Sequence, residues 1–277
     1  MSGIDRVDVT TADGAAIEIE DAALRFGERT LWSGLDLTVA PGEFLAVLGP
    51  NGSGKTSLLR VLLGLQPLSA GTVTVAGRPP GRGSERIGYV PQQRAVDDGL
   101  TLRGRDLVGL GLDGHRWGFG LRGLRRRRAR IDAAIEAVGA QRYADSPVYK
   151  LSGGEQQRLR VAQALVGEPE VLLCDEPLAS LDLAHQRVVA ELIDERRRAA
   201  DTAVLFVTHA INPILPYVDR VLYLVDGRFR IGTPDEVMTS RTLSELYCSR
   251  VEVVRIGGQI HVAGAHSALC EDEVHHF

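Results

Sequence analysis

Residues 44–57 read FLAVLGPNGSGKTS, which is a short apolar run, a glycine-rich turn and the start of a helical pattern. The run from Phe44 to Leu48 is apolar at every position, as is typical of a strand buried on both faces of a parallel sheet. The segment from Ser57 to Leu63 reads as a helix. A strand, a glycine-rich loop and a helix in this order, with the spacing G-x-x-x-x-G-K-[ST], predict a phosphate-binding loop.

The chemistry of this loop follows from its residue types. Glycines let the backbone curl so that successive N–H groups point at an anion, and the following helix adds the positive end of its dipole. We expect the Lys55 ammonium to reach the β- and γ-phosphates of a nucleotide, and the Thr56 hydroxyl to bind Mg²⁺. The predicted nucleotide-binding residues of the loop are Gly49, Pro50, Asn51, Gly52, Ser53, Gly54, Lys55, Thr56 and Ser57.

A second apolar run, Val171 to Cys174, ends in the acidic pair Asp175 and Glu176. A carboxylate at the end of a buried strand holds Mg²⁺ in phosphate-loop NTPases, and Asp175 fits that role. Glu176 beside it can polarise a water molecule for attack on the γ-phosphate. The loop and this strand together predict an enzyme that hydrolyses a nucleoside triphosphate.

The remaining pattern indicates how the chain is organised around this site. Apolar runs at 204–207 and 221–225 alternate with helical patterns, which predicts an α/β fold. Residues 17–19 and 35–39 alternate apolar and polar, as in half-buried strands, whereas 95–150 has a helical character.

The composition argues against two classes of protein. The chain has 36 acidic residues against 32 Lys and Arg, and the resulting net charge of −4 argues against a dedicated nucleic-acid binder. No stretch approaches the ~18–20 apolar residues that a membrane-spanning helix needs. If the protein acts at a membrane, we expect other chains to span it.

Residues 151–155, Leu-Ser-Gly-Gly-Glu, resemble the signature sequence of the ABC (ATP-binding cassette) ATPases. The family's other motifs are matched in order by Phe26, where the family has an aromatic that stacks on adenine, Gln92 in the Q-loop, Asp182 in the D-loop and the switch histidine His209. The resemblance covers about residues 15–240.

This resemblance implies the fold and its subdivision. The implied α/β fold has a P-loop NTPase core, made of a RecA-like parallel sheet and an antiparallel β subdomain, with an inserted α-helical subdomain. The implied boundaries are a flexible leader at 1–14, an ATPase domain at 15–240 with the helical insert at about 95–165, and a C-terminal extension with a polar tail at 241–277.

The resemblance also implies a division of roles between two copies of the chain in a head-to-tail homodimer. In one copy, Glu176 acts as the base, His209 holds the γ-phosphate and Gln92 senses Mg²⁺. The implied Mg²⁺ ligands are Thr56, Gln92 and Asp175, and the residues that complete the ATP site around the dimer interface are Ser152, Gly153, Gly154, Glu155 and Asp182. The implied partners are transmembrane permease subunits and a substrate-binding protein, with this chain peripheral on the cytoplasmic face of the cell membrane.

The signals for the transported cargo lie in the insert and in the tail. The segments 105–108, 110–111 and 117–119 resemble the ABC subgroup that serves zinc and manganese uptake. Beyond Pro234 we expect a helix, a strand at 251–256 and then a polar tail. The tail is either a plain mobile terminus or a metal-binding segment, and its candidate ligands are His261, His266, Cys270, Glu271, Asp272, Glu273, His275 and His276.

Other functions remain open at this point. Within transport, the cargo could be a siderophore, haem or another solute, or a substrate for export. Outside transport, the chain could be a soluble ABC ATPase of translation or DNA repair, but it has a single phosphate loop and no sustained heptads before the signature. A regulatory cassette that binds ATP without cleaving it is disfavoured by Lys55, Asp175, Glu176 and His209.

Overall fold

The computed structural model describes residues 14–92, 102–113, 124–179 and 181–264. The strands are β1 (Ile17–Phe26), β2 (Arg29–Val39), β3 (Phe44–Leu48), β4 (Ala70–Val75), β5 (Ile87–Val90), β6 (Val171–Asp175), β7 (Ala203–Val207), β8 (Arg220–Val225), β9 (Arg228–Gly232), β10 (Glu252–Ile256) and β11 (Gln259–Ala263). The α-helices are α1 (Lys55–Leu62), α2 (Gly104–Asp113), α3 (Leu124–Ala137), α4 (Gly153–Leu165), α5 (Leu183–Ala200), α6 (Pro234–Val237) and α7 (Ser240–Tyr247). No helix within these ranges is long and apolar enough to cross a bilayer.

The central layer is a six-stranded sheet in the order β5-β6-β7-β3-β8-β9. The first five strands of this order run parallel, and β9 pairs antiparallel with β8. Neighbouring residues of β3 point to opposite faces, so Phe44 and Ala46 belong to one hydrophobic core and Leu45 and Val47 to the other. All four are fully buried, which confirms the predicted parallel strand.

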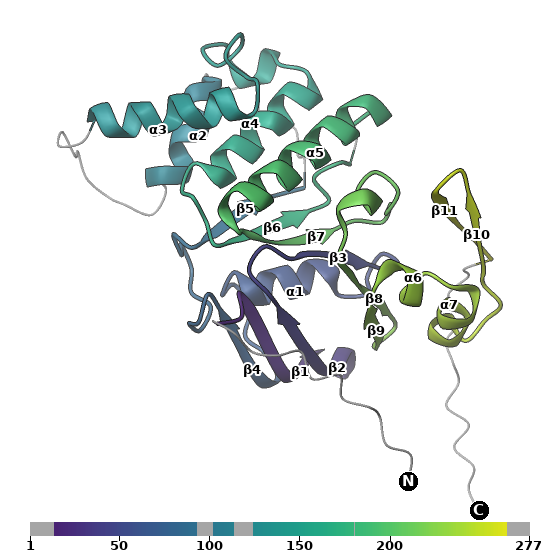
Figure 1. Ribbon diagram of the computed structural model, residues 1–277. Helices are drawn as coiled ribbons and strands as arrows, with labels where there is room; N and C mark the ends of the chain where they lie inside the picture. The colour runs from purple at the N-terminus through teal and green to yellow at the C-terminus, as the bar shows by residue number, and fades with distance from the viewer. Residues whose placement is uncertain (1–13, 93–101, 114–123, 180, 265–277) are drawn as a thin grey trace, which may run out of the picture.

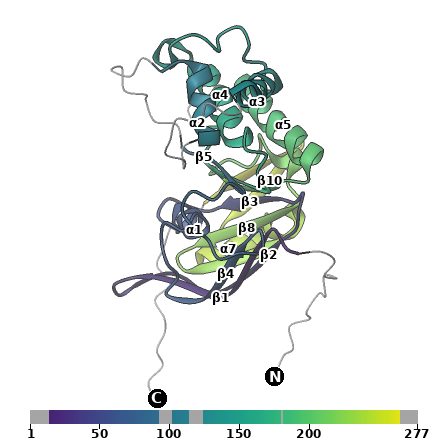
Figure 2. The same cartoon turned by 90° about the vertical axis from the view of Figure 1, so that its left-hand side faces the viewer.

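A second sheet, in the order β2-β1-β4, is antiparallel throughout and forms the predicted antiparallel β subdomain. Helix α1 lies between this sheet and the central sheet (Figures 1 and 2). Its buried residues Leu58 and Leu62 share one core with Ile17 of β1 and Leu35 of β2. The helix that follows the phosphate-binding loop is therefore enclosed on both sides.

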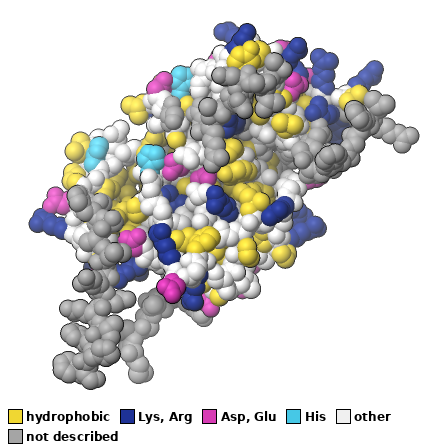
Figure 3. All heavy atoms as spheres, turned by 180° about the vertical axis from the view of Figure 1, so that it is seen from behind, with side chains coloured by type: hydrophobic (Ala, Val, Ile, Leu, Met, Phe, Trp, Pro, Cys, Tyr) yellow, Lys and Arg dark blue, Asp and Glu magenta, His cyan; other side chains and the backbone are white. Residues whose placement is uncertain are grey.

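Helices α2, α3 and α4 form the end of the molecule opposite the antiparallel sheet (Figures 1 and 2). The contact between α2 and α4 is close, because a Cβ added at Gly111 would lie 2.0 Å from the carbonyl oxygen of Gln163. Lys and Arg side chains gather at this end (Figure 3), among them the exposed Arg125, Arg126 and Arg128 of α3. The segment 117–119, used above for the cargo, lies outside the described residues.

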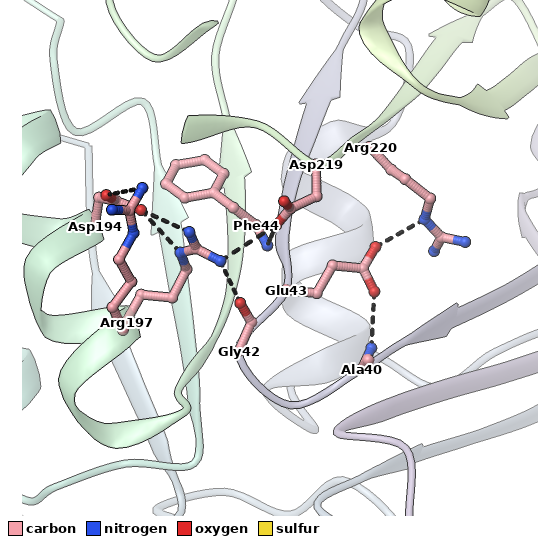
Figure 4. Close-up of polar contacts among 9 residues, drawn as sticks. Ala40, Gly42, Glu43, Phe44, Asp194, Arg197, Asp219 and Arg220 are labelled. Carbon is pink, nitrogen blue, oxygen red and sulfur yellow. Dashed lines mark hydrogen bonds and ion pairs between the residues drawn. The ribbon is translucent and has the colours of Figure 1, made fainter. Parts of the chain in front are cut away.

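A polar network ties α5 to the amino ends of β3 and β8 (Figure 4). The Arg197 guanidinium donates to the carboxylates of Asp194 at 2.8 Å and Asp219 at 3.2 Å, and also to the carbonyl of Gly42. Asp219 in turn accepts the backbone N–H of Phe44 at 2.8 Å. The Arg197 and Asp194 side chains are only 11% and 6% exposed, so this ion pair is shielded from water, whereas Asp219 is half exposed.

The C-terminal extension departs from its predicted pattern. The strand expected at 251–256 is present as β10, but the residues after it are not all tail, because β11 pairs antiparallel with β10. The connection is Gly257-Gly258, with φ angles of 57° and 77°, and such a pair suits a two-residue hairpin turn. Apart from the buried Ile260, the residues of β11 are exposed.

Candidate functional site

The phosphate-binding loop connects β3 to α1, and its glycines hold conformations closed to other residues. Gly49 has φ 137°, and a Cβ there would lie 2.0 Å from the carbonyl oxygen of Leu224 on β8. Gly54 has φ 98°, and its Cβ would lie 3.0 Å from the indole ring of Trp32 on β2. Residues of both sheets therefore lie in close contact with the loop, and only glycine fits at these two positions of its backbone.

Lys55 begins α1 and turns its ammonium back over the loop. Its Nζ donates to the carbonyl oxygens of Gly49 and Pro50, both at 2.8 Å. Burial lowers the pKa of Lys55, although the carboxylates of Glu176 and Asp175 act in the opposite direction. A cation held in this place lies beside the backbone N–H groups that would receive the phosphates.

The two candidate Mg²⁺ ligands Thr56 and Asp175 meet although they come from different elements. The Thr56 hydroxyl at the start of α1 donates to Asp175 Oδ1 at the end of β6, at 3.3 Å. Burial raises the pKa of Asp175, and the hydrogen bond from Thr56 partly offsets this. A hydroxyl and a carboxylate oxygen side by side are the hard donors that suit Mg²⁺.

Glu176 is the meeting point of the three predicted catalytic side chains. Gln92 Nε2 donates to Glu176 Oε2 at 3.2 Å, and His209 Nδ1 lies 3.6 Å from the same oxygen. The Glu176 backbone has a positive φ of 47° and donates its N–H to the Val207 carbonyl at 2.9 Å. A non-glycine residue in this conformation is strained, and such strain often marks a functional position.

The signature residues form the first turn of α4. Ser152 caps this helix, because its Oγ accepts the Glu155 N–H at 3.3 Å while Glu155 Oε2 accepts the Ser152 N–H at 2.8 Å. Gly153 and Gly154 occupy the start of the helix, where the dipole favours an anion. These contacts are separate from those that join Glu176, Gln92 and His209.

The remaining predicted residues lie at chain turns. Asp182 caps α5, accepting the His185 N–H at 2.9 Å, and this bond together with the His185 side chain holds the pKa of Asp182 below its usual range. Phe26 ends β1 and is 50% exposed, so its ring is free to stack on a flat ligand.

Two residues that the sequence reasoning missed contact the motifs. His185 Nδ1 lies 2.8 Å from Asp182, and a Cβ added at Gly154 would lie only 2.6 Å from the His185 ring. Arg29 donates to the carbonyl oxygen of Gly52 at 3.3 Å, which places a second cation at the phosphate-binding loop. The sequence signal that could have identified His185 is the Asp182-x-x-His185 spacing at the start of a helix. Arg29 has no comparable signal in the sequence.

The C-terminal candidate ligands are only partly placed. His261 lies exposed on β11, and the other tail candidates lie outside the described residues. In the part of the chain that the structure describes, no group of three or more His, Cys, Asp or Glu could hold a metal ion.

Comparisons with known proteins agree with this geometry. The profile of the ABC transporter family matches residues 32–179. The zinc transport system ATP-binding protein TroB of Treponema pallidum is 32% identical, with 94% of this chain and 98% of that protein covered. The zinc import ATP-binding protein ZnuC of Cereibacter sphaeroides is 38% identical, with 81% and 85% covered.

Solved structures with the same fold include ATPases of transport complexes. An inward-facing putative metal-chelate type ABC transporter matches with a TM-score of 0.76 at 25% identity, covering 90% of this chain and 96% of that one. The cbiO1 protein of Clostridium perfringens, part of the ABC transporter complex cbiONQ, matches with a TM-score of 0.71 at 25% identity, covering 83% and 93%.

Proposed function

Since this chain belongs to the ABC transporter family, as an ATP-binding subunit with ATPase activity, we propose that it drives the import of a divalent metal ion, Zn²⁺ or Mn²⁺. The names of the relatives support zinc most directly, because TroB and ZnuC are zinc transport proteins and align over most of both chains. The likeness to a metal-chelate type transporter supports a second cargo class, a chelated metal such as a siderophore or haem complex.

The hydrolysis mechanism that we propose is built on the meeting of Gln92 and His209 at Glu176. Glu176 orients a water molecule and takes its proton as the water attacks the γ-phosphate. His209 and Lys55 then stabilise the negative charge that develops on the phosphate oxygens.

Residues of this chain would hold Mg²⁺ beside the phosphates. Thr56 and Asp175 are its proposed ligands, joined in the structure by a 3.3 Å hydrogen bond, and Gln92 is the third. Bound there, Mg²⁺ would neutralise phosphate charge. The oxygen atoms of these side chains are chemically suited to that ion.

We further propose that two copies of the chain act together. In this arrangement Ser152, Gly153, Gly154 and Glu155 present the start of α4 to the ATP of the opposite copy, with Asp182 beside the interface. Phe26 stacks on the adenine of the copy's own ATP. The implied assembly also contains transmembrane permease subunits and a substrate-binding protein, and it places this chain on the cytoplasmic face of the membrane.

The experiment that tests this function uses the membrane complex purified with this chain. ATP hydrolysis is measured with the substrate-binding protein added empty, loaded with Zn²⁺, loaded with Mn²⁺ or loaded with a metal chelate, and the Glu176→Gln complex serves as the control without turnover. Stimulation by the Zn²⁺- or Mn²⁺-loaded protein is expected. Stimulation by the chelate-loaded protein alone would overturn the free-metal cargo.

A further inference from the structure

The backbone of the loop that carries His209, residues 208–214, is held on both sides of the histidine. Thr208 Oγ1 accepts the Ala210 N–H at 3.1 Å and donates to the Ala210 carbonyl at 3.2 Å. Thr208 donates its N–H to the carbonyl of Val47 at 3.1 Å, and Ile211 and Ile214 are buried in the core. The His209 side chain is 62% exposed, and the one ion pair that the described residues show for it is with Glu176. Its position therefore depends on how residues 210–214 are held.

Asn212 holds this loop to the C-terminal hairpin. Its Nδ2 donates to the carbonyl of Ile260 at 2.9 Å, and its Oδ1 accepts the N–H of Ile260 at 2.8 Å. One side-chain amide thus satisfies both backbone groups of a residue on β11, as a neighbouring strand would. We call these two bonds the amide clasp.

Apolar packing around Ile260 supports the amide clasp. Ile260 is 4% exposed and belongs to the same core cluster as Ile211 and Ile214, the two anchors of the loop. In Figure 1 the hairpin of β10 and β11 stands at the edge of the molecule, next to α6 and α7. The hairpin therefore reaches the interior mainly through the residue that Asn212 binds.

We propose that the β10–β11 hairpin positions His209 through the amide clasp, and so sets the rate of ATP hydrolysis from outside the nucleotide-binding motifs. This inference rests on the proposed role of His209 at the γ-phosphate. Asn212 lies three residues beyond His209. A shift of the backbone at Asn212 therefore changes the position of the histidine, and small displacements of catalytic groups lower reaction rates. Asn212 is accordingly a positioning residue, because its side-chain amide binds the backbone of Ile260 and acts on His209 only through the loop.

The chain offers a matched control for the structural part of this effect. On α7, Ser244 Oγ accepts the N–H of Val251 at 2.9 Å and donates to its carbonyl at 3.1 Å. Ser244 thus ties the start of the same hairpin by the same kind of paired bond, but it does not contact the His209 loop.

The test compares Asn212→Ala with Ser244→Ala in the full-length chain and in its membrane complex, measuring kcat, KM for ATP and the melting temperature. Asn212→Ala should lower kcat about three- to tenfold and leave KM nearly unchanged. This range corresponds to the loss of one or two uncharged hydrogen bonds that help to position His209 in the transition state. Asn212→Asp should lower kcat at least as far as Asn212→Ala, because a carboxylate oxygen would replace Nδ2 and face the Ile260 carbonyl oxygen, which accepts a bond at 2.9 Å in the native chain. Ser244→Ala should lower the melting temperature to a similar extent and leave kcat unchanged.

The possible results separate this inference from the proposed function. If His209→Ala and Glu176→Gln both abolish turnover while Asn212→Ala keeps a wild-type kcat, the amide clasp has no catalytic role and the function stands. An equal loss of kcat in Ser244→Ala and Asn212→Ala would reduce the clasp to general stability and overturn the inference. If His209→Ala hydrolyses ATP at the wild-type rate, the proposed site itself fails.

Discussion

Substituting Gly154 by alanine should change the stability of the chain with a sign that depends on His185. The added Cβ would lie 2.6 Å from Cδ2 of the His185 ring, closer than carbon atoms approach without movement. The ring must therefore shift, and the shift breaks its 2.8 Å contact with Asp182 at the start of α5.

The magnitude follows from three contributions. Alanine in place of glycine favours a helix by up to about 1 kcal/mol. Displacing the ring costs about 1–3 kcal/mol of packing strain, and the broken pair, 46% and 66% exposed, adds less than about 1 kcal/mol. Gly154→Ala should thus destabilise the native chain by about 1 kcal/mol, but stabilise a His185→Ala chain by up to about 1 kcal/mol.

A double-mutant cycle measured by urea unfolding provides the assay. The four proteins needed are the wild type, the two single variants and the double variant, and the expected coupling between the two sites is about 1–2 kcal/mol. Additive effects, with a coupling below about 0.3 kcal/mol, would refute the claim that His185 packs against the signature turn.

Three further predictions concern the ATP site and the core. Glu176→Gln should still bind ATP but hydrolyse it at least about 100-fold more slowly, as measured by phosphate release, and wild-type turnover would contradict its role as base. Because burial raises the pKa of Asp175, this carboxylate takes up a proton at a higher pH than an ordinary aspartate. Mg²⁺-dependent ATP binding, measured by calorimetry, should therefore weaken as the pH falls. The weakening should begin at a pH at which exposed carboxyl groups are still ionised. Arg197→Ala should destabilise the fold by about 3 kcal/mol, because it leaves Asp194 buried with one cation fewer, and the fall in melting temperature should come with unchanged ATP affinity.

The meeting of the predicted site residues could be foreseen from the sequence, because these residues follow the ends of parallel strands. Asp175 ends β6 and Glu176 follows it, the phosphate-binding loop follows β3, and His209 comes after β7. The parallel sheet therefore brings these residues to one edge. The alternation from Ile17 to Ile19 likewise indicated a half-buried strand, because successive residues of a strand point to opposite faces of the sheet.

Several contacts missed from the sequence are made by single side chains across long separations. Asn212 reaches Ile260, 48 residues away, and Arg197 reaches Gly42, 155 residues away. Neither pairing leaves a periodic pattern, since a polar residue looks the same in the sequence whether or not it has a distant partner. The strand β11 did leave a signal that the sequence reasoning did not use, because Ile260 and Val262 alternate with polar residues after the Gly257-Gly258 pair.

The enclosure of α1 between the two sheets has a consequence for how the molecule opens. Separating the β1–β2–β4 sheet from the rest would expose Leu58 and Leu62 and release the helix on which Lys55 stands. The antiparallel sheet and the phosphate-binding loop therefore belong to one cooperative unit that cannot unfold piecemeal. The helices α2 and α3 bury their side chains in the other core, so displacing them would leave the packing around α1 in place.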